Sequence, residues 1–105
     1  MPASVCMNFV VRKRSLAEAD AADAALWHEA QAPGLGGDFL DEVEAAITSL
    51  EQDALLYRVR FSEVRCLRLR RFKAYGVYYV IRGPEVWVLA VLHGAREVEK
   101  LLQQR

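Results

Sequence analysis

Residues 75–92 read Tyr-Gly-Val-Tyr-Tyr-Val-Ile-Arg-Gly-Pro-Glu-Val-Trp-Val-Leu-Ala-Val-Leu, two runs of β-branched and aromatic residues around a polar turn. Such residues favour extended backbone, and Arg82-Gly-Pro-Glu85 between the runs is typical of a hairpin loop. Both runs are apolar almost without interruption. We therefore expect two central strands of a sheet that is covered on both faces.

A third strand is predicted just upstream, over residues 64–72. Leu67 and Leu69 alternate there with polar positions, which suits a half-exposed strand with Cys66, Arg68 and Arg70 on the other side. Phe9-Val-Val11 is a short β-rich run and predicts a first strand. The expected sheet therefore has four strands.

Two helices are predicted between the first and second of these strands. The first runs from Ser15 to Ala32, with Ser15 and Glu18 at capping-box spacing and an apolar face sketched by Leu16, Ala19, Leu26, Trp27 and Ala30. Pro33-Gly34 ends it. The second opens at Gly36-Gly-Asp38, with Asp38 as the expected N-cap. Its buried side is predicted by the spacing of Phe39/Leu40, Val43, Ala46/Ile47 and Leu50.

The order of elements predicts an α+β fold, in which a two-helix hairpin packs on a mainly antiparallel four-stranded sheet (β-α-α-β-β-β). Val98 to Gln104 is amphipathic and predicts a short C-terminal helix. The chain has 105 residues, which suits a single domain over 1–105. Residues 1–6 are interpreted as a flexible extension.

Composition narrows the class of protein. Two cysteines cannot form a disulfide framework, and no cluster of Cys or His has metal-ligand spacing, so we expect no metal and no cofactor. There is neither a leader-like N-terminus nor an apolar run long enough to span a bilayer, which predicts a soluble cytoplasmic protein without a membrane partner. Cys66 is interpreted as a buried small apolar residue.

Charge is strongly separated along the chain. Residues 1–53 carry three basic and ten acidic side chains, whereas residues 54–105 carry eleven basic and four acidic ones. The halves therefore bear −7 and +7, which predicts a dipolar molecule whose basic face attracts a phosphate backbone or an acidic peptide. A solvated strand edge guarded by charge is the alternative explanation.

Several short motifs, in this order and spacing, resemble the RelE/ParE toxin superfamily of type II toxin–antitoxin modules. The carriers are Trp27-His28, Gly34-Leu-Gly36, Phe39-Leu-Asp-Glu-Val43, Arg65, Arg71-Phe-x-x-Tyr-x-Val-x-Tyr79 and Val88-Leu-Ala-Val-Leu-His-Gly-Ala-Arg96. The Gly-Leu-Gly turn and the His-Gly-Ala-Arg ending are closer to the ParE branch, whose toxins inhibit DNA gyrase without nuclease activity. Phe72-Lys-Ala-Tyr75 departs from the Phe-Pro-Tyr usual in the family.

The ParE-like resemblance implies a non-enzymatic toxin whose partners are DNA gyrase and a cognate antitoxin, with a homodimer or a toxin–antitoxin hetero-oligomer as the assembly. No catalytic residue is expected in that case. The residues expected to contact the target or the antitoxin are Arg65, Arg68, Arg70, Arg71, Tyr75 and Arg96. Arg65 falls in the register opposite to Arg68, where a structural ion pair is the alternative.

The RelE-like branch, which cleaves mRNA on the ribosome, is the alternative and leaves open whether the chain is an enzyme. Such a nuclease needs an acid, a base and cations around the scissile phosphate. The residues that would fill these roles are Arg68, Arg70, His93 and Arg96. Against it, Gly76 replaces the arginine that follows the third-strand tyrosine, and Leu101 and Leu102 occupy the segment where a tyrosine is expected. A decayed, non-toxic family member is a third possibility. His28 is interpreted as structural.

Overall fold

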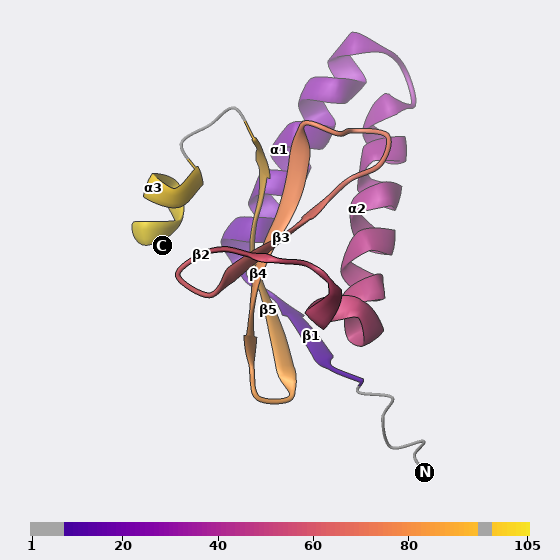
Figure 1. Ribbon diagram of the computed structural model, residues 1–105. Coiled ribbons are helices and arrows are strands. Elements are labelled where there is room, and N and C mark those ends of the chain that lie inside the picture. Colours follow the sequence, from indigo (N-terminus) through magenta and orange to yellow (C-terminus); the bar gives the residue numbers. More distant parts are fainter. Residues whose placement is uncertain (1–7, 95–97) are drawn as a thin grey trace.

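The computed structural model describes residues 8–94 and 98–105 (Figure 1). The elements follow the predicted order, with one additional strand and a 3-10 turn. They are β1 (Val10–Lys13), α1 (Ser15–Gln31), α2 (Leu35–Asp53), η2 (Ala54–Leu56), β2 (Val59–Phe61), β3 (Val64–Arg68), β4 (Tyr75–Arg82), β5 (Glu85–His93) and α3 (Val98–Gln103). The strands form one sheet in the order β1-β5-β4-β3-β2.

The sheet is antiparallel except at one edge. The α1–α2 hairpin carries the chain across the sheet, so that β1 pairs in parallel with β5, while β2, β3, β4 and β5 pair antiparallel in sequence order. The long β4–β5 hairpin forms the centre, with an irregularity in its register between Tyr78 and Tyr79. The predicted α+β fold is confirmed.

Helices lie on both sides of this sheet. α1 and α2 cover one face and α3 lies against the other (Figure 1). The larger core, on the α1–α2 side, is centred on side chains with no exposed surface, among them Phe39, Leu50, Val77 and Tyr79. A smaller core on the α3 side joins Cys66, Tyr78, Val80, Leu92 and Val98. The unbroken apolar runs of β4 and β5 are explained by this double cover.

The expected count of four strands was wrong by one, because the short edge strand β2 precedes β3. The two strands are joined by a tight turn in which Ser62 and Glu63 both have positive φ, 42° and 69°. Two-residue hairpins of this kind usually contain Asn-Gly or Asp-Gly. A Ser-Glu turn lacks that signal, so the pattern gave no sign of a hairpin.

The third predicted strand was too long, since β3 ends at Arg68 and not at Phe72. A carboxylate from α2 explains the end: the backbone N–H groups of Arg70 and Arg71 donate to Glu42. These donors are therefore not available to a sheet ladder, and the chain turns before Tyr75. As a consequence, Arg70 does not share a strand face with Arg68.

The predicted apolar face of α1 was also wrong. Its buried residues are Ala17, Ala21, Ala25 and His28, whereas Leu16, Leu26 and Trp27 are 49%, 71% and 58% exposed. The helices approach each other closely, because a Cβ on Gly36 of α2 would lie 2.5 Å from the Ala25 carbonyl oxygen. Such close packing accepts alanine and glycine and excludes leucine, so the small residues face inward.

Both helices begin differently from the prediction. α1 has Arg14 as its N-cap residue and no side-chain cap, so the Ser15–Glu18 capping box does not form. α2 starts at Leu35 after Gly34 in the left-handed conformation, and not at Asp38. The carboxylate of Glu29 in α1 accepts hydrogen bonds from the backbone N–H groups of Gly34 and Gly36. A side chain of the other helix therefore supplies the acceptor that N–H groups at the start of a helix lack.

The buried side of α2 largely agrees with the predicted spacing, since Phe39, Val43, Ile47 and Leu50 are buried, whereas Leu40 is exposed and Ala46 is half-buried. The predicted C-terminal helix is confirmed as α3. No helix among the described residues is long and apolar enough to cross a membrane. The expected flexible extension, residues 1–6, lies outside the described residues.

Candidate functional site

Arg65 points toward the α2 side of the sheet, as the opposite register predicted. Its guanidinium donates to the carbonyl oxygen of Tyr57 at 2.6 Å and to that of Leu55 at 3.5 Å. Both carbonyls belong to the segment that connects α2 to β2. Arg65 therefore ties this connection to the sheet, through backbone carbonyls and not through the ion pair considered above.

The other arginines of the basic stretch lie at the end of β3 and in the loop that follows it. Arg68 is exposed and donates to the carbonyl oxygen of Lys73 at 3.2 Å. Arg71 forms an ion pair with Asp38 at 3.0 Å and lies over the Phe72 ring at 5.4 Å. The Arg70 side chain is exposed, while its backbone is held by α2. The loop thus presents cationic side chains on a backbone that is held by hydrogen bonds to α2.

A groove between α2 and β3 runs beside the segment that carries Arg68 and Arg70. It has a volume of about 330 Å³ and a floor that includes Ala46, Tyr57 and Leu67, with Arg68 and Arg70 among its lining residues. Glu42 and Asp53 add carboxylates to the same lining. We call it the Arg-lined groove.

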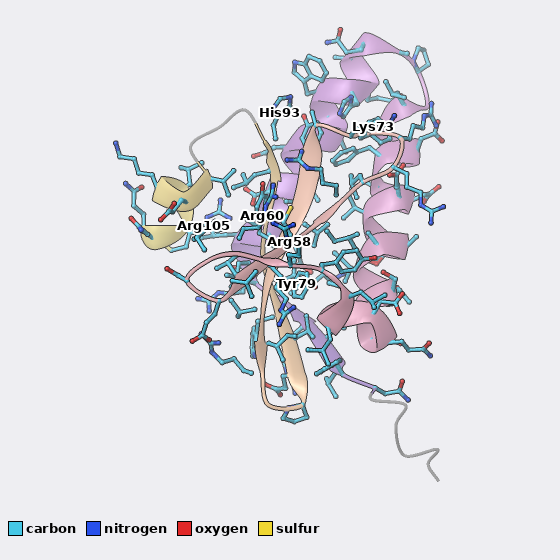
Figure 2. The ribbon with its side chains drawn as sticks, viewed as in Figure 1. Arg58, Arg60, Lys73, Tyr79, His93 and Arg105 are labelled. Carbon is cyan, nitrogen blue, oxygen red and sulfur yellow. The ribbon has the colours of Figure 1, made fainter. Side chains whose placement is uncertain are left out.

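Tyr75 is the first residue of β4, and His93 is the last residue of β5. They are register partners, and their rings meet edge to face with centroids 5.2 Å apart. Lys73 and His93 lie at the same end of the molecule (Figure 2). Both line a hollow of about 430 Å³, which we call the aromatic hollow. Its lining residues are Trp27, His28, Phe72, Lys73, Ala74, Tyr75 and His93.

His28, interpreted from sequence as structural, forms the inner wall of this hollow. It is 8% exposed and is packed among rings, with centroids 4.9 Å from Phe72, 5.0 Å from Phe39 and 5.4 Å from Tyr75. Its Nε2 atom is buried without a hydrogen-bond partner among the described residues. Burial lowers the pKa of His28, so the ring is held neutral. The pattern of α1 did not reveal this role, because it placed Leu26 on the buried side.

Arg68 and His93 lie at the same end of the sheet but on opposite faces. Arg68 pairs with Gly76, which pairs with Leu92, whereas His93 pairs with Tyr75 one residue away. Side chains alternate across a strand, so the histidine projects toward α1 and α2, and the arginine projects toward the face that bears Cys66. Arg96, the remaining candidate, lies outside the described residues.

Cys66 and Tyr78 form a buried pair on that second face, in line with the interpretation of Cys66 as an apolar core residue. Burial raises the pKa of the Cys66 thiol and the pKa of the Tyr78 hydroxyl, and the two groups share a hydrogen bond. Gly76 leaves the space that the sulfur occupies, because a Cβ there would lie 2.5 Å from it. A thiol held protonated by burial is a poor nucleophile.

The comparison with protein families decides which toxin branch the motifs indicate. Residues 11–98 match the family described as the ParE toxin of the type II toxin–antitoxin system, parDE. The chain belongs to the ParE toxin family. The resemblance found in the sequence is thereby confirmed, and the match runs from within β1 to the first residue of α3, so it includes both long helices and β2 to β5.

The fold of this ParE family member is also found in a solved structure. The "Chromosomal ParDE TA system from P. aeruginosa" superposes with a TM-score of 0.69 at 20% identity, covering 83% of this chain and 97% of the other. At this identity the likeness establishes the shared fold. No curated protein sequence matches the chain.

Proposed function

We propose that this ParE-family chain inhibits DNA gyrase by binding it, without cutting nucleic acid, and is neutralised by a cognate antitoxin. The observation that carries the non-catalytic part is the placement of Arg68 and His93 on opposite faces of the sheet. Cleavage of RNA through its own 2′-oxygen requires acid–base groups and cations around one phosphate. Arg68 and His93 leave the sheet on opposite faces, and the Arg68 guanidinium turns to the Lys73 carbonyl oxygen and the Gly94 backbone at the end of the sheet.

The residue at position 76 supports the same conclusion. The RelE-like pattern has an arginine directly after the third-strand tyrosine, and here Gly76 is buried beside the Cys66 sulfur. An arginine at this position would require the buried thiol to move. At position 76 the arginine of the RelE-like pattern is therefore replaced by a glycine packed against the Cys66 sulfur.

The Arg-lined groove supports an antitoxin as the partner. Its floor is apolar, and Arg70 lines it with an exposed side chain, whereas the Arg68 side chain projects toward the other face of the sheet. An antitoxin segment with apolar side chains and a carboxylate would bury the apolar side chains against the floor and pair the carboxylate with the Arg70 guanidinium. We infer that the cognate antitoxin docks in this groove, as a segment that becomes ordered when it binds.

Induced expression in a bacterium tests the target. We expect growth arrest with gyrase-linked DNA breaks and intact ribosome-bound mRNA, and inhibition of supercoiling when the purified protein is added to gyrase. Codon-linked cuts in mRNA would overturn the proposal in favour of the nuclease. Absence of both arrest and gyrase inhibition would also overturn it, and would indicate a decayed toxin.

A charge reversal tests the antitoxin site separately. Arg70→Glu should weaken antitoxin binding by roughly tenfold or more, because a charge-assisted hydrogen bond is replaced by repulsion. Arg82→Glu is the matched control, since Arg82 lies on the β4–β5 hairpin and pairs with Glu63. Equal effects of the two changes would contradict the assignment of the groove.

A further inference from the structure

We propose that the aromatic hollow is a docking site for an acidic peptide segment of a protein partner, with one aromatic side chain inserted into the hollow and a neighbouring carboxylate on Lys73. The hollow lies between the C-terminal half of α1, the loop after β3 and the end of β5. It is separate from the Arg-lined groove and does not depend on which target the toxin acts on.

The walls of the hollow are already assembled. Phe39 lies behind it, with ring centroids 5.0 Å from both Phe72 and Tyr75, in edge-to-face contact with each. The Tyr75 ring in turn contacts His93. These contacts hold the lining rings in place before a ligand arrives, so binding costs little side-chain entropy. A volume of about 430 Å³ lies within the usual range of ligand sites, about 300–1,000 Å³.

Helix α1 contributes exposed apolar surface to the rim of the hollow. Trp27 lines the hollow and is 58% exposed. Tryptophan is the residue type most often found at the energetic centre of a protein–protein interface. The patch therefore favours a protein segment as the occupant.

Charge selects the kind of segment. Lys73 is exposed at the rim, and within the described part of the chain no carboxylate lies within ion-pair distance of its ammonium group. The nearby cation Arg71 lies over the Phe72 ring and is already paired with Asp38. The inner wall contributes no competing charge, because His28 is neutral. Lys73 is thus the group that would receive a carboxylate next to the inserted ring.

The two tryptophans of the chain provide a direct binding signal. Trp87 is on β5 and donates to Glu85, at the opposite end of that strand from His93. In a Trp87→Phe background, Trp27 is the remaining tryptophan and reports on the hollow. We expect its fluorescence to change saturably when the peptide Ac-Glu-Asp-Phe-Asp-amide is added, with a dissociation constant on the order of millimolar or lower.

Matched peptides and variants make the assignment specific. Replacing the phenylalanine of the peptide by alanine should abolish the signal, and replacing its acidic residues by lysine should weaken binding by roughly fivefold or more. Lys73→Glu should reverse this charge preference, whereas Lys100→Gln on α3 should leave binding unchanged. The Trp27→Ala variant should lose most of its affinity for the peptide. Binding to this variant is measured by the shifts of the backbone amide NMR signals of His93 and Gly94.

Three outcomes would overturn the proposal. One is no saturable change up to about 10 mM peptide. Another is equal binding of the acidic and lysine-bearing peptides, which would show a non-specific apolar contact. The third is saturation by uridine monophosphate or a short oligothymidylate without saturation by the peptide, which would assign the hollow to nucleic acid. None of these readouts depends on growth arrest or gyrase inhibition, so the two proposals fail independently.

Discussion

Replacing Gly76 by alanine tests the packing of the sheet face that lacks the RelE-type arginine. A Cβ at this position would lie 2.5 Å from the Cys66 sulfur and 3.4 Å from a ring carbon of Tyr78. Cys66 is itself buried in the core beneath α3, so the sulfur has little room to move. We therefore expect Gly76→Ala to be destabilising, although alanine suits a strand better than glycine.

Two opposing contributions set the magnitude. Overpacking a well-filled core by one methyl group costs about 1–3 kcal/mol of unfolding free energy. Restricting the unfolded chain by a Gly-to-Ala change returns about 0.4–1 kcal/mol where the backbone allows alanine, and Gly76 is not among the residues with positive φ. The net loss should be about 1–2 kcal/mol, which lowers the melting temperature of a domain of this size by roughly 5–15 °C.

A double-mutant cycle with Cys66→Ala isolates the contact. Removing the sulfur removes the clash, so Gly76→Ala should become neutral or stabilising by up to about 1 kcal/mol in that background. Urea unfolding followed by circular dichroism measures all four proteins. If Gly76→Ala costs the same with and without the sulfur, the steric explanation is refuted.

Three further changes probe other contacts. Tyr79→Phe should cost about 1–2 kcal/mol of unfolding free energy, because the buried tyrosine hydroxyl donates to the Ala54 carbonyl oxygen at 2.6 Å. Unchanged urea unfolding would show that this bond contributes nothing. Arg105→Ala should lower the unfolding free energy by about 1–2 kcal/mol, because Arg105 donates two hydrogen bonds to the Asp20 carboxylate, at 2.8 and 2.9 Å, and both side chains are largely buried. A double-mutant cycle with Asp20→Ala that shows a coupling energy under about 0.3 kcal/mol would contradict this prediction. Stability should fall as pH drops below about 6.5, because the unfolded chain takes up a proton at His28, whereas the folded chain, in which the pKa of His28 is lowered, does not. The loss of unfolding free energy, at most about 1.4 kcal/mol per pH unit, should be absent in His28→Phe. Parallel pH profiles of unfolding for the two proteins would refute the argument.

Local patterns predicted much of the architecture. The buried side of α2 was read correctly from Phe39, Val43 and Ile47, because a three- and four-residue spacing is a property of the helix itself. The central strands β4 and β5 were likewise evident from their composition. The predicted boundaries of an element were wrong where they depend on groups far away in the chain. Strand β3 ends at Arg68 because Glu42, 28 residues before Arg70, accepts the backbone N–H groups that follow the strand.

Site residues show the same division. The sequence indicated a family, a basic stretch and a list of candidate arginines, and it predicted correctly that Arg65 opposes Arg68. It did not show that α1 would bury alanines and leave Leu26 and Trp27 exposed, because the closeness of α2 at Gly36 is a property of the packed pair.

What the chain determined by itself, then, is the order and type of its long elements, since periodicity and turn residues act over a few neighbouring positions. The tertiary structure decided which side chains meet. The aromatic hollow joins Trp27 and His28 to Phe72, Tyr75 and His93 from three separate segments. The separation of Arg68 from His93 follows from sheet register. Both arise from contacts between residues far apart in the chain, and no local pattern records them.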